Sequence, residues 1–176
     1  MTTRTGAPAR PLLVVFAGLP GVGKSTLARQ VGSALRVPVL AVDPVDRELG
    51  RHEVTEPRPG HAAYGIVAAQ AETQLGMGVP VVVDAVNPVA ATRRLWQEIA
   101  DRTGVPLRVV EVWCGDETEH RRRVESRLAE EGGAGTPDWA QVVGRRAEYE
   151  PYVGPRLIVD TAVPGDPLPG LLAYLR

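Results

Sequence analysis

The sequence is poor in several residue types, and each shortage excludes a class of protein. Its 176 residues contain one cysteine, Cys114, which excludes an intrachain disulfide and a metal site built only from cysteines. No apolar run approaches the roughly 20 residues that cross a bilayer. The net charge is −1 and aromatic residues make up 5%, so no basic or aromatic surface favours nucleic acid or an anionic membrane as partner. We therefore expect a cytoplasmic enzyme or binding module, monomeric or homodimeric.

Lysine is the scarcest charged residue. Of the 20 basic residues only Lys24 is a lysine, which suggests that arginine would not serve at this position of an arginine-rich chain. A compact ammonium can act as a point charge among phosphate oxygens, whereas a planar guanidinium is bulkier. The shortage also excludes a GTPase switch, because its guanine-reading motif Asn-Lys-x-Asp requires a lysine elsewhere in the chain.

Short apolar segments alternate with longer helical patterns along the chain. The pattern predicts strands over residues 12–17, 38–42, 79–84, 107–112 and 157–159, and helices over residues 24–35, 61–76, 88–103, 116–131, 137–150 and 168–175. Strands separated by helices form βαβ units, so we expect a three-layer α/β fold with a five-stranded, mainly parallel sheet. Residues 1–11 are predicted to be a flexible polar tail, and residues 12–176 a single domain.

The stretch GLPGVGKST, residues 18–26, follows the first predicted strand and opens the first predicted helix. Gly18, Gly23, Lys24 and Ser25 match the phosphate-binding pattern G-x-x-x-x-G-K-[ST]. Glycines let backbone N–H groups turn toward anionic oxygens, and the helix N-terminus adds partial positive charge. We expect Lys24 to reach the β- and γ-phosphates of ATP, and Ser25 to ligate Mg²⁺. The predicted nucleotide-binding residues are Gly18, Leu19, Pro20, Gly21, Val22, Gly23, Lys24, Ser25 and Thr26.

Two aspartates follow predicted strands, at the sheet edge where ligands bind in such folds. Asp84 ends the run VVVD and is expected to hold Mg²⁺ or its water shell. Ala85 follows it, so the glutamate with which ATPases orient an attacking water is missing, and transfer to an acceptor hydroxyl is favoured over hydrolysis. Asp43 is the candidate base for that hydroxyl. Because Asp-Pro is also a good helix start with Asp43 as N-cap, both interpretations stay open.

Cations for the transferring phosphoryl group are expected from HRRRVESR, residues 120–127. His120, Arg123 and Arg127 fall on one face of the predicted helix, although such a charged face can also be simply solvated. The segment EEGGAGTP, residues 130–137, provides the mobile end that a lid needs. Arg123 and Arg127 are therefore predicted catalytic residues, together with Lys24 and Asp43, in a site closed by a helical lid.

These features together resemble the small P-loop kinases, a group that includes shikimate and gluconate kinases, chloramphenicol phosphotransferase, zeta toxins and the kinase domain of phage polynucleotide kinase. The likeness rests on GLPGVGKST, VVVDAVNPVAATRRLWQEIA, HRRRVESR and WAQVVGRRAEYEPY, and it covers nearly the whole chain after residue 11. It implies ATP-dependent, Mg²⁺-assisted transfer of the γ-phosphoryl group to a hydroxyl. It also implies that Asp43 is the base, that Arg123 and Arg127 are lid arginines, and that Asn87 lies near the nucleotide or acceptor.

The acceptor is expected over DRELGRHEVTEPRPGHAAYG, residues 46–65. Candidate residues for binding it are Arg47, Arg51, His61, Tyr64 and Asn87. The arginines and histidine favour a small-molecule acceptor with acidic or hydrogen-bond-accepting groups. Two alternatives stay open, namely a kinase for polynucleotide or nucleoside 5′-hydroxyls, and a nucleotide-binding regulatory or interaction module without transfer activity.

Overall fold

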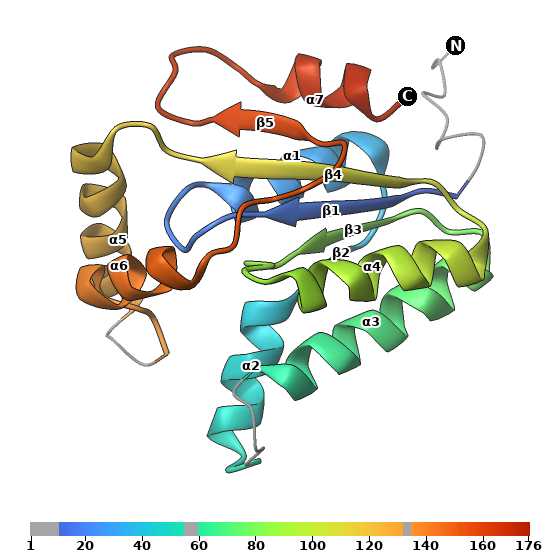
Figure 1. Ribbon diagram of the computed structural model, residues 1–176, viewed down its shortest axis with the longest axis horizontal. Coiled ribbons are helices and arrows are strands. Elements are labelled where there is room, and N and C mark those ends of the chain that lie inside the picture. Colours follow the sequence, from blue (N-terminus) through green and yellow to red (C-terminus); the bar gives the residue numbers. More distant parts are fainter. Residues whose placement is uncertain (1–10, 55–59, 132–134) are drawn as a thin grey trace.

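A parallel sheet with helices on both faces forms the body of the protein (Figure 1). The computed structural model describes residues 11–54, 60–131 and 135–176. The strands are β1 (Leu13–Ala17), β2 (Val39–Ala41), β3 (Val81–Asp84), β4 (Leu107–Trp113) and β5 (Leu157–Asp160). The helices are α1 (Lys24–Leu35), α2 (Val42–Arg51), α3 (His61–Gly76), α4 (Ala90–Thr103), α5 (Glu117–Glu131), α6 (Trp139–Glu148) and α7 (Leu168–Tyr174).

The strand order β2-β3-β1-β4-β5 brings the predicted site residues to one edge of the sheet. All the strand pairs are parallel, and Asp84 at the end of β3 is in register with Phe16 of β1 and Ala41 of β2. The loop that follows β1, the helix that follows β2 and the last residue of β3 therefore meet at the carboxyl ends of the strands. The predicted three-layer α/β fold with a five-stranded sheet is confirmed.

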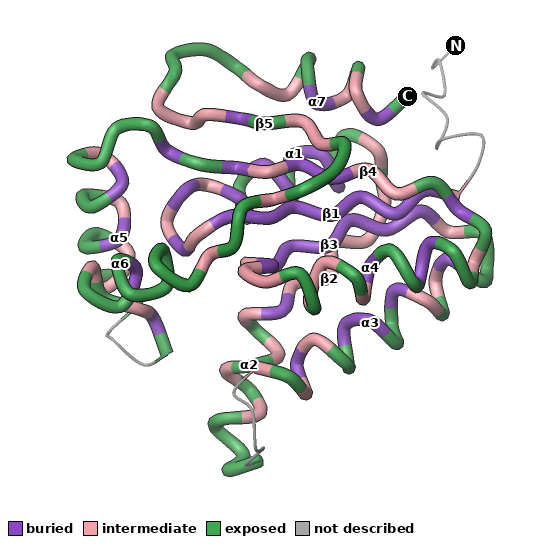
Figure 2. The backbone as a smooth tube through the Cα atoms, in the orientation of Figure 1, coloured by how far each residue is buried: buried purple, intermediate pink, exposed green. Residues whose placement is uncertain are grey.

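Two apolar cores lie on opposite faces of the sheet. Leu13 and Val15 of β1 belong to the core covered by α3 and α4, whereas Phe16 belongs to the core under α1 and α7. Alternate residues of a strand point to opposite faces, so both faces of β1 are covered and all its residues are buried (Figure 2). This double burial explains why β1 reads as the continuous apolar run LVVFA.

The segment after β2 differs from the prediction. The strand ends at Ala41, and α2 begins directly at Val42, two residues before the start that Asp43 as N-cap would give. The N-cap is Ala41, so the interpretation of Asp43 as an N-cap is wrong: Asp43 is the second residue of the helix and Pro44 the third. Pro44 is tolerated there because the first N–H groups of a helix have no intrahelical acceptor, and a missing donor costs little.

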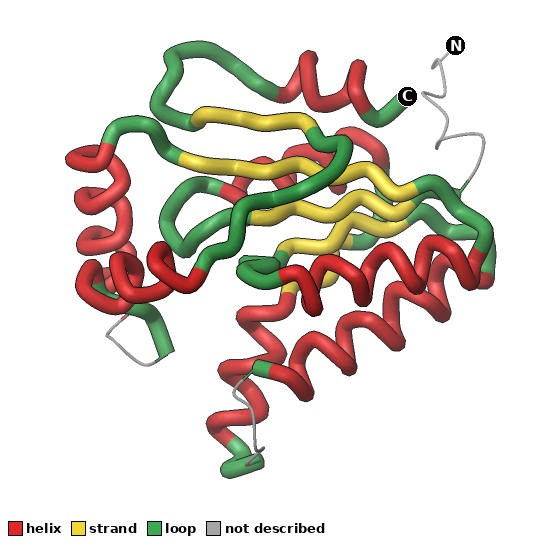
Figure 3. Tube along the Cα trace, in the orientation of Figure 1, coloured by secondary structure: helices red, strands yellow, loops and turns green. Residues whose placement is uncertain are grey.

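The helical lid consists of α5 and α6, which lie together at one end of the molecule, away from α3 and α4 (Figure 3). Helix α5 starts where the Glu119 N–H donates to Asp116 Oδ1 (3.1 Å). Helix α6 starts with a reciprocal cap, in which the Asp138 carboxylate accepts from the Gln141 N–H and the Gln141 side chain accepts from the Asp138 N–H. Caps of this kind fix where each lid helix begins.

Parts of three predicted segments lie outside the described residues. These are residues 1–10 of the predicted tail, residues 55–59 of the acceptor segment and residues 132–134 of the glycine-rich connection. In the described ranges, none of the helices is both long and apolar enough to span a membrane.

Candidate active site

The loop of residues 18–26 is fastened to three other parts of the chain. One contact comes from the loop after β3, one from α5 and one from the loop after β5. They are the hydrogen bond from the Gly18 N–H to Val86 O (3.1 Å), the contact of His120 Nε2 with Pro20 O (2.8 Å) and the hydrogen bond from the Thr161 hydroxyl to Val22 O (2.8 Å). Two carbonyl groups and one N–H group of the loop are thereby held by the surrounding protein.

Two glycines of this loop are required by close approach. Gly18 has φ 138°, and a Cβ there would collide with the carbonyl oxygen of Val112 in β4. Gly21 has φ 82°, and its Cβ would lie 2.5 Å from Val124 Cγ2 of α5. Side chains at these places would push the loop away from the sheet or from the lid, so the glycine spacing reflects packing as well as the room needed by a ligand.

Helix α1 begins at Lys24 with an N-terminus open to a ligand. Its N-cap is Gly23, no side chain caps it, and no acidic residue lies in its first turn. Within the described residues, the N–H groups of Lys24, Ser25 and Thr26 have no acceptor, as is usual for a first helical turn. The Lys24 Nζ donates to Leu19 O at 3.0 Å. Free N–H groups with the partial positive charge of a helix N-terminus suit phosphate oxygens.

Lys24 is the centre of the charge arrangement. Its side chain is buried, and this burial lowers the pKa of the ammonium. Asp84 and Asp43 oppose the shift, while Arg127 and Arg145 add to it. Each of these groups acts on the buried ammonium by Coulomb interaction. Both predicted carboxylates and one of the two predicted lid arginines thus contribute to the electrostatic environment of Lys24.

Ser25 and Asp84 fit a Mg²⁺ ion carried by the nucleotide. Asp84 is buried at the end of β3, and no side chain of the described residues donates a hydrogen bond to its carboxylate. The described residues hold no cluster of three or more His, Cys, Asp or Glu that could bind a metal by themselves. Mg²⁺ usually takes one or two protein oxygens and completes its shell with phosphates and waters, so this donor set suits it.

The two predicted lid arginines lie on one helix but contact different groups. The Arg127 Nε pairs with Glu131 (2.9 Å). The Arg123 Nε donates to Glu119 (2.8 Å) and its Nη1 to the Thr161 hydroxyl (2.8 Å). Arg123 also borders a cavity of about 580 Å³ between α1 and the loop after β5. Arg123 is thus placed beside this cavity, while Arg127 acts on Lys24.

Arg145 is a further candidate for the site that the sequence did not single out. It lies on α6, and its charge contributes to the lowered pKa of Lys24. Its neighbour Arg146 contacts Glu117 (3.1 Å) and His120 (3.5 Å) instead. The stretch GRR shows both arginines in the sequence. The sequence does not show which of the two faces the site, because that depends on the residues that each side chain meets in the fold.

Tyr64 is a predicted acceptor-binding residue whose pKa responds to the charges of both aspartates. Its hydroxyl oxygen accepts a hydrogen bond from the Asn87 N–H (2.8 Å). Burial raises the pKa of Tyr64, and the charges of Asp43 and Asp84 contribute to the shift. The phenol therefore keeps its proton and can donate a hydrogen bond.

Asn87 is completely buried, and both polar atoms of its side chain are hydrogen-bonded. Its Oδ1 accepts from Trp96 Nε1 (2.7 Å) and its Nδ2 donates to Phe16 O (3.2 Å). Its φ of 52° is unusual for a residue other than glycine. These bonds join the end of β1 to the loop after β3, so Asn87 fixes the position of that loop relative to the sheet.

The other predicted acceptor-binding residues differ in their surroundings. Arg47 is half-buried on α2, where a Cβ added to Gly135, at the end of the lid connection, would lie 3.0 Å from its Cγ. Arg51 is exposed and pairs with Glu48 (2.9 Å). His61 is exposed at the start of α3. Of these three residues, Arg47 is thus the one that lies against the connection between α5 and α6.

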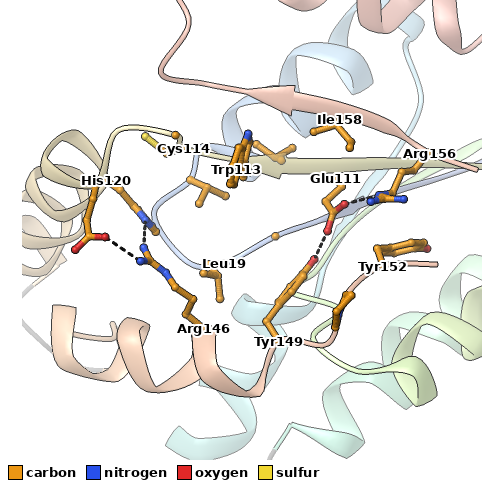
Figure 4. A pocket seen from close by; sticks show the side chains of 16 residues that line it. Leu19, Glu111, Trp113, Cys114, His120, Arg146, Tyr149, Tyr152, Arg156 and Ile158 are labelled. Carbon is orange, nitrogen blue, oxygen red and sulfur yellow. Dashed lines mark hydrogen bonds and ion pairs between the residues drawn. The ribbon is translucent and has the colours of Figure 1, made fainter. Parts of the chain in front are cut away.

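A second cavity of about 620 Å³ lies between β4, α6 and the loop of residues 18–26 (Figure 4). Glu111 accepts hydrogen bonds there from the Tyr149 hydroxyl (3.4 Å) and from Arg156. Burial, aided by the charge of Glu111, raises the pKa of Tyr149 to about 12. The Trp113 side chain is 56% exposed beside them. Because Glu111 and Arg156 are paired with each other, they offer little net charge to a ligand.

The buried His120 leads to a prediction about pH and stability. Burial lowers the pKa of His120; the Pro20 carbonyl opposes this shift, and Arg146, Arg123 and Lys24 add to it. The unfolded chain, with the usual pKa of about 6.5, then binds this proton more readily, so the free energy of unfolding decreases as the pH falls below about 6.5. We expect a lower melting temperature at pH 5.5 than at pH 7.5, with a smaller difference in His120→Gln. Thermal melts that show equal pH dependence in both proteins would contradict this.

The open helix N-terminus after β1, the buried lysine and the helical lid define a protein with a P-loop kinase-like nucleotide-binding fold. A family model described as "AAA domain" (AAA_33) matches residues 13–151, which is most of the chain. The chain therefore belongs to the AAA_33 family. No protein with a curated function matches it.

Several solved structures share this fold. A candidate kinase from Chloroflexus aurantiacus J-10-fl has a TM-score of 0.76 at 20% identity, with 96% of each chain covered. Kti12 from Chaetomium thermophilum, solved with ADP-AlF3, has a TM-score of 0.70 at 19% identity, covering 93% of this chain and 99% of Kti12. The APS kinase CysC from Mycobacterium tuberculosis, solved with AMPPNP and APS, has a TM-score of 0.66 at 22% identity, covering 96% and 99%. At these identities the likeness shows the fold.

Proposed function

We propose that the protein is an ATP-dependent kinase that transfers the γ-phosphoryl group to a hydroxyl of a small molecule, assisted by Mg²⁺. The observation that carries the proposal is the buried Lys24 at the open N-terminus of α1, on which the charges of Asp43, Asp84, Arg127 and Arg145 act. Cations fixed at one point stabilise the charge of a transferring phosphoryl group. A carboxylate at the same point can orient the attacking hydroxyl and accept its proton.

In the proposed reaction each group has a separate task. Lys24 and the N–H groups at the start of α1 hold the β- and γ-phosphates, while Ser25 and Asp84 would hold the Mg²⁺. The ion supplies charge neutralisation on the phosphate oxygens. Asp43 takes the proton of the acceptor hydroxyl. At the same time the acceptor oxygen bonds to the γ-phosphorus, and the bond between the γ-phosphorus and the ADP oxygen breaks. Arg127 of α5 and Arg145 of α6 stabilise the charge on the transferring group.

The proposal places the nucleoside in the cavity beside Arg123. Gly23 and Thr26 of the phosphate loop line this cavity together with the loop after β5, so a nucleoside attached to phosphates in the loop can reach it. The acceptor is then proposed to lie on the other side of Lys24, where Tyr64 and Arg47 are available. We also propose that the protein is cytoplasmic, that it is a monomer or homodimer, and that it acts on neither membrane nor nucleic acid.

The proposal is tested by a transfer screen with ATP labelled at the γ-phosphate. The acceptor pools are sugars, nucleosides, hydroxy acids, hydroxylated antibiotics and 5′-hydroxyl oligonucleotides, with Lys24→Ala as the background control. We expect labelled product from one small-molecule class. Label on oligonucleotides or nucleosides would support the 5′-hydroxyl kinase instead. ATP binding without transfer to any pool would support a nucleotide-binding module.

Asp84→Ala is expected to weaken the metal dependence more than acceptor binding. Because the carboxylate is proposed to bind Mg²⁺ or a water of its shell, its loss should raise the Mg²⁺ concentration for half-maximal activity by about tenfold or more. A Mg²⁺ titration of the transfer rate measures this, with Glu72→Gln on the exposed face of α3 as a control. An unchanged Mg²⁺ midpoint with a raised acceptor KM would move Asp84 to the acceptor side.

A further inference from the structure

His120 connects the lid to the phosphate loop, although it is not part of the phosphate-binding pattern of residues 18–25. Its side chain is buried under the loop. Its Nε2 lies 2.8 Å from Pro20 O. Its Nδ1 lies 3.5 Å from the Arg146 guanidinium of α6 (Figure 4). The edge of the ring meets Trp139 of α6, with ring centroids 5.2 Å apart and planes at 89°. One imidazole thus contacts the phosphate loop and α6 while belonging to α5.

The partners of His120 determine which nitrogen carries its proton. A carbonyl oxygen can only accept, so Nε2 must donate to Pro20 O. A guanidinium can only donate, so Nδ1 must accept from Arg146. Both contacts are satisfied only by a neutral ring with its proton on Nε2. The positive charges that face the ring, Lys24 from the loop, Arg123 from its own helix and Arg146 from α6, favour the same neutral form.

The bond to Pro20 also fixes the orientation of the next amide. In a trans peptide plane the C=O and the following N–H point in opposite directions. When Pro20 O points to α5, the Gly21 N–H must therefore point away from α5. Gly21 packs directly against this helix, since its Cβ would lie 2.5 Å from Val124 Cγ2, so the loop cannot turn over without leaving the lid.

We propose that His120 is a positioning residue for the nucleotide, because its hold on Pro20 O keeps the Gly21 N–H turned toward the phosphates. The same contact makes the order of the phosphate loop depend on the docking of α5 and α6. The inference rests on the proposed nucleotide binding and adds to it a residue about 100 positions away in the chain.

Two variants separate the hydrogen bond from packing. His120→Phe keeps a ring against Trp139 but removes the donor, whereas His120→Gln keeps an amide N–H near the position of Nε2. Leaving a buried carbonyl without its donor is expected to raise the Kd for ATP about tenfold in His120→Phe, while His120→Gln stays within about threefold of the wild type. The Kd is measured by calorimetry at pH 7.5. In transfer assays the KM for ATP should rise more than kcat falls, because saturating ATP restores the loop.

Controls distinguish the possible failures. His52→Phe, at the exposed end of α2, is a matched change that should leave the Kd for ATP unaltered. Equal increases of the Kd in both His120 variants, or an unchanged Kd with a lower melting temperature, would show that the ring only packs the helix and would overturn the inference. If the wild type binds ATP no better than Lys24→Ala does, the proposed function has failed instead.

A measurement on the wild type avoids the need for folded variants. Long-range ¹H–¹⁵N NMR spectra report which imidazole nitrogen carries the proton, and the sequence has only three histidines to assign. His52→Gln and His61→Gln identify two of them. At pH 7.5 we expect a protonated Nε2 and a bare Nδ1 for His120. A proton on Nδ1 would overturn the inference, since Nε2 could not then donate to Pro20 O.

Discussion

Lys24→Ala is expected to abolish phosphoryl transfer and to leave the fold intact. Removing one preorganised group that stabilises transition-state charge typically lowers kcat by about 10²–10³-fold, and Lys24 is the buried cation of the loop. Burial lowers its pKa, which means that folding disfavours the charged form, so the protein does not depend on this charge for stability. Transfer of label from γ-labelled ATP, measured beside a thermal melt, tests both halves of the prediction.

Lys24→Arg is the matched variant, because it keeps a positive charge. The Nζ of Lys24 is confined to hydrogen-bonding distance of Leu19 O, and a planar guanidinium needs more room than a compact ammonium. We expect this variant to be nearly as inactive as Lys24→Ala. Full activity in Lys24→Arg would mean that the single lysine has no special role, and near-normal kcat in Lys24→Ala would contradict the proposed task of the loop.

The fold could be predicted because its signals are local. The residues of β1 are buried on both faces and form the continuous apolar run LVVFA, and the turn that follows needs glycine wherever a Cβ would strike β4 or α5. Within about a dozen residues the chain passes from a strand through a glycine turn to the start of a helix. Few alternative folds contain this order of elements. Apart from α2, the helices could be predicted from their period, with ends displaced by one or two residues.

Helix α2 shows where such signals mislead. Val42, Val45 and Leu49 follow a helical spacing, and all three pack against the core that α3 covers. The pattern was hidden because β2 continues into α2 without a turn residue between them. Asp43 and Pro44 also imitate the start of a helix two residues further on. Only the packing of the apolar face against α3 decides the matter.

The missed or misplaced site residues depend on contacts between distant segments. Periodicity puts His120, Arg123 and Arg127 on one face of α5, but it does not say what opposes that face. The structure places His120 under the phosphate loop and Arg123 against Thr161 in the loop after β5. The charge of Arg145 acts on Lys24 from α6, more than 100 residues further along the chain. The role of a charged side chain depends on its partner, and a single sequence does not name partners.

Asp43→Asn separates a catalytic carboxylate from a structural one. Asp43 is not the N-cap of α2 but its second residue, and its charge acts on both Lys24 and Tyr64. Asparagine keeps the size and much of the hydrogen bonding but cannot take a proton. We expect kcat to fall by roughly 10²-fold or more, the usual effect of losing a general base. The melting temperature should change little, because a charge in a first helical turn contributes only about 0.3–1 kcal/mol.

The measurement is kcat at saturating ATP and acceptor, beside a thermal melt of the same samples. Glu72→Gln is the matched control, since it makes the same acid-to-amide change at a surface pair with Arg102 (2.7 Å) and should keep the normal rate. Phosphoryl transfer can pass through a loose transition state that needs little help from a base. The size of the drop therefore measures how much proton transfer contributes to the barrier. Full activity in Asp43→Asn would contradict a catalytic role for this carboxylate and leave positioning by Lys24, Mg²⁺ and the lid arginines as the mechanism.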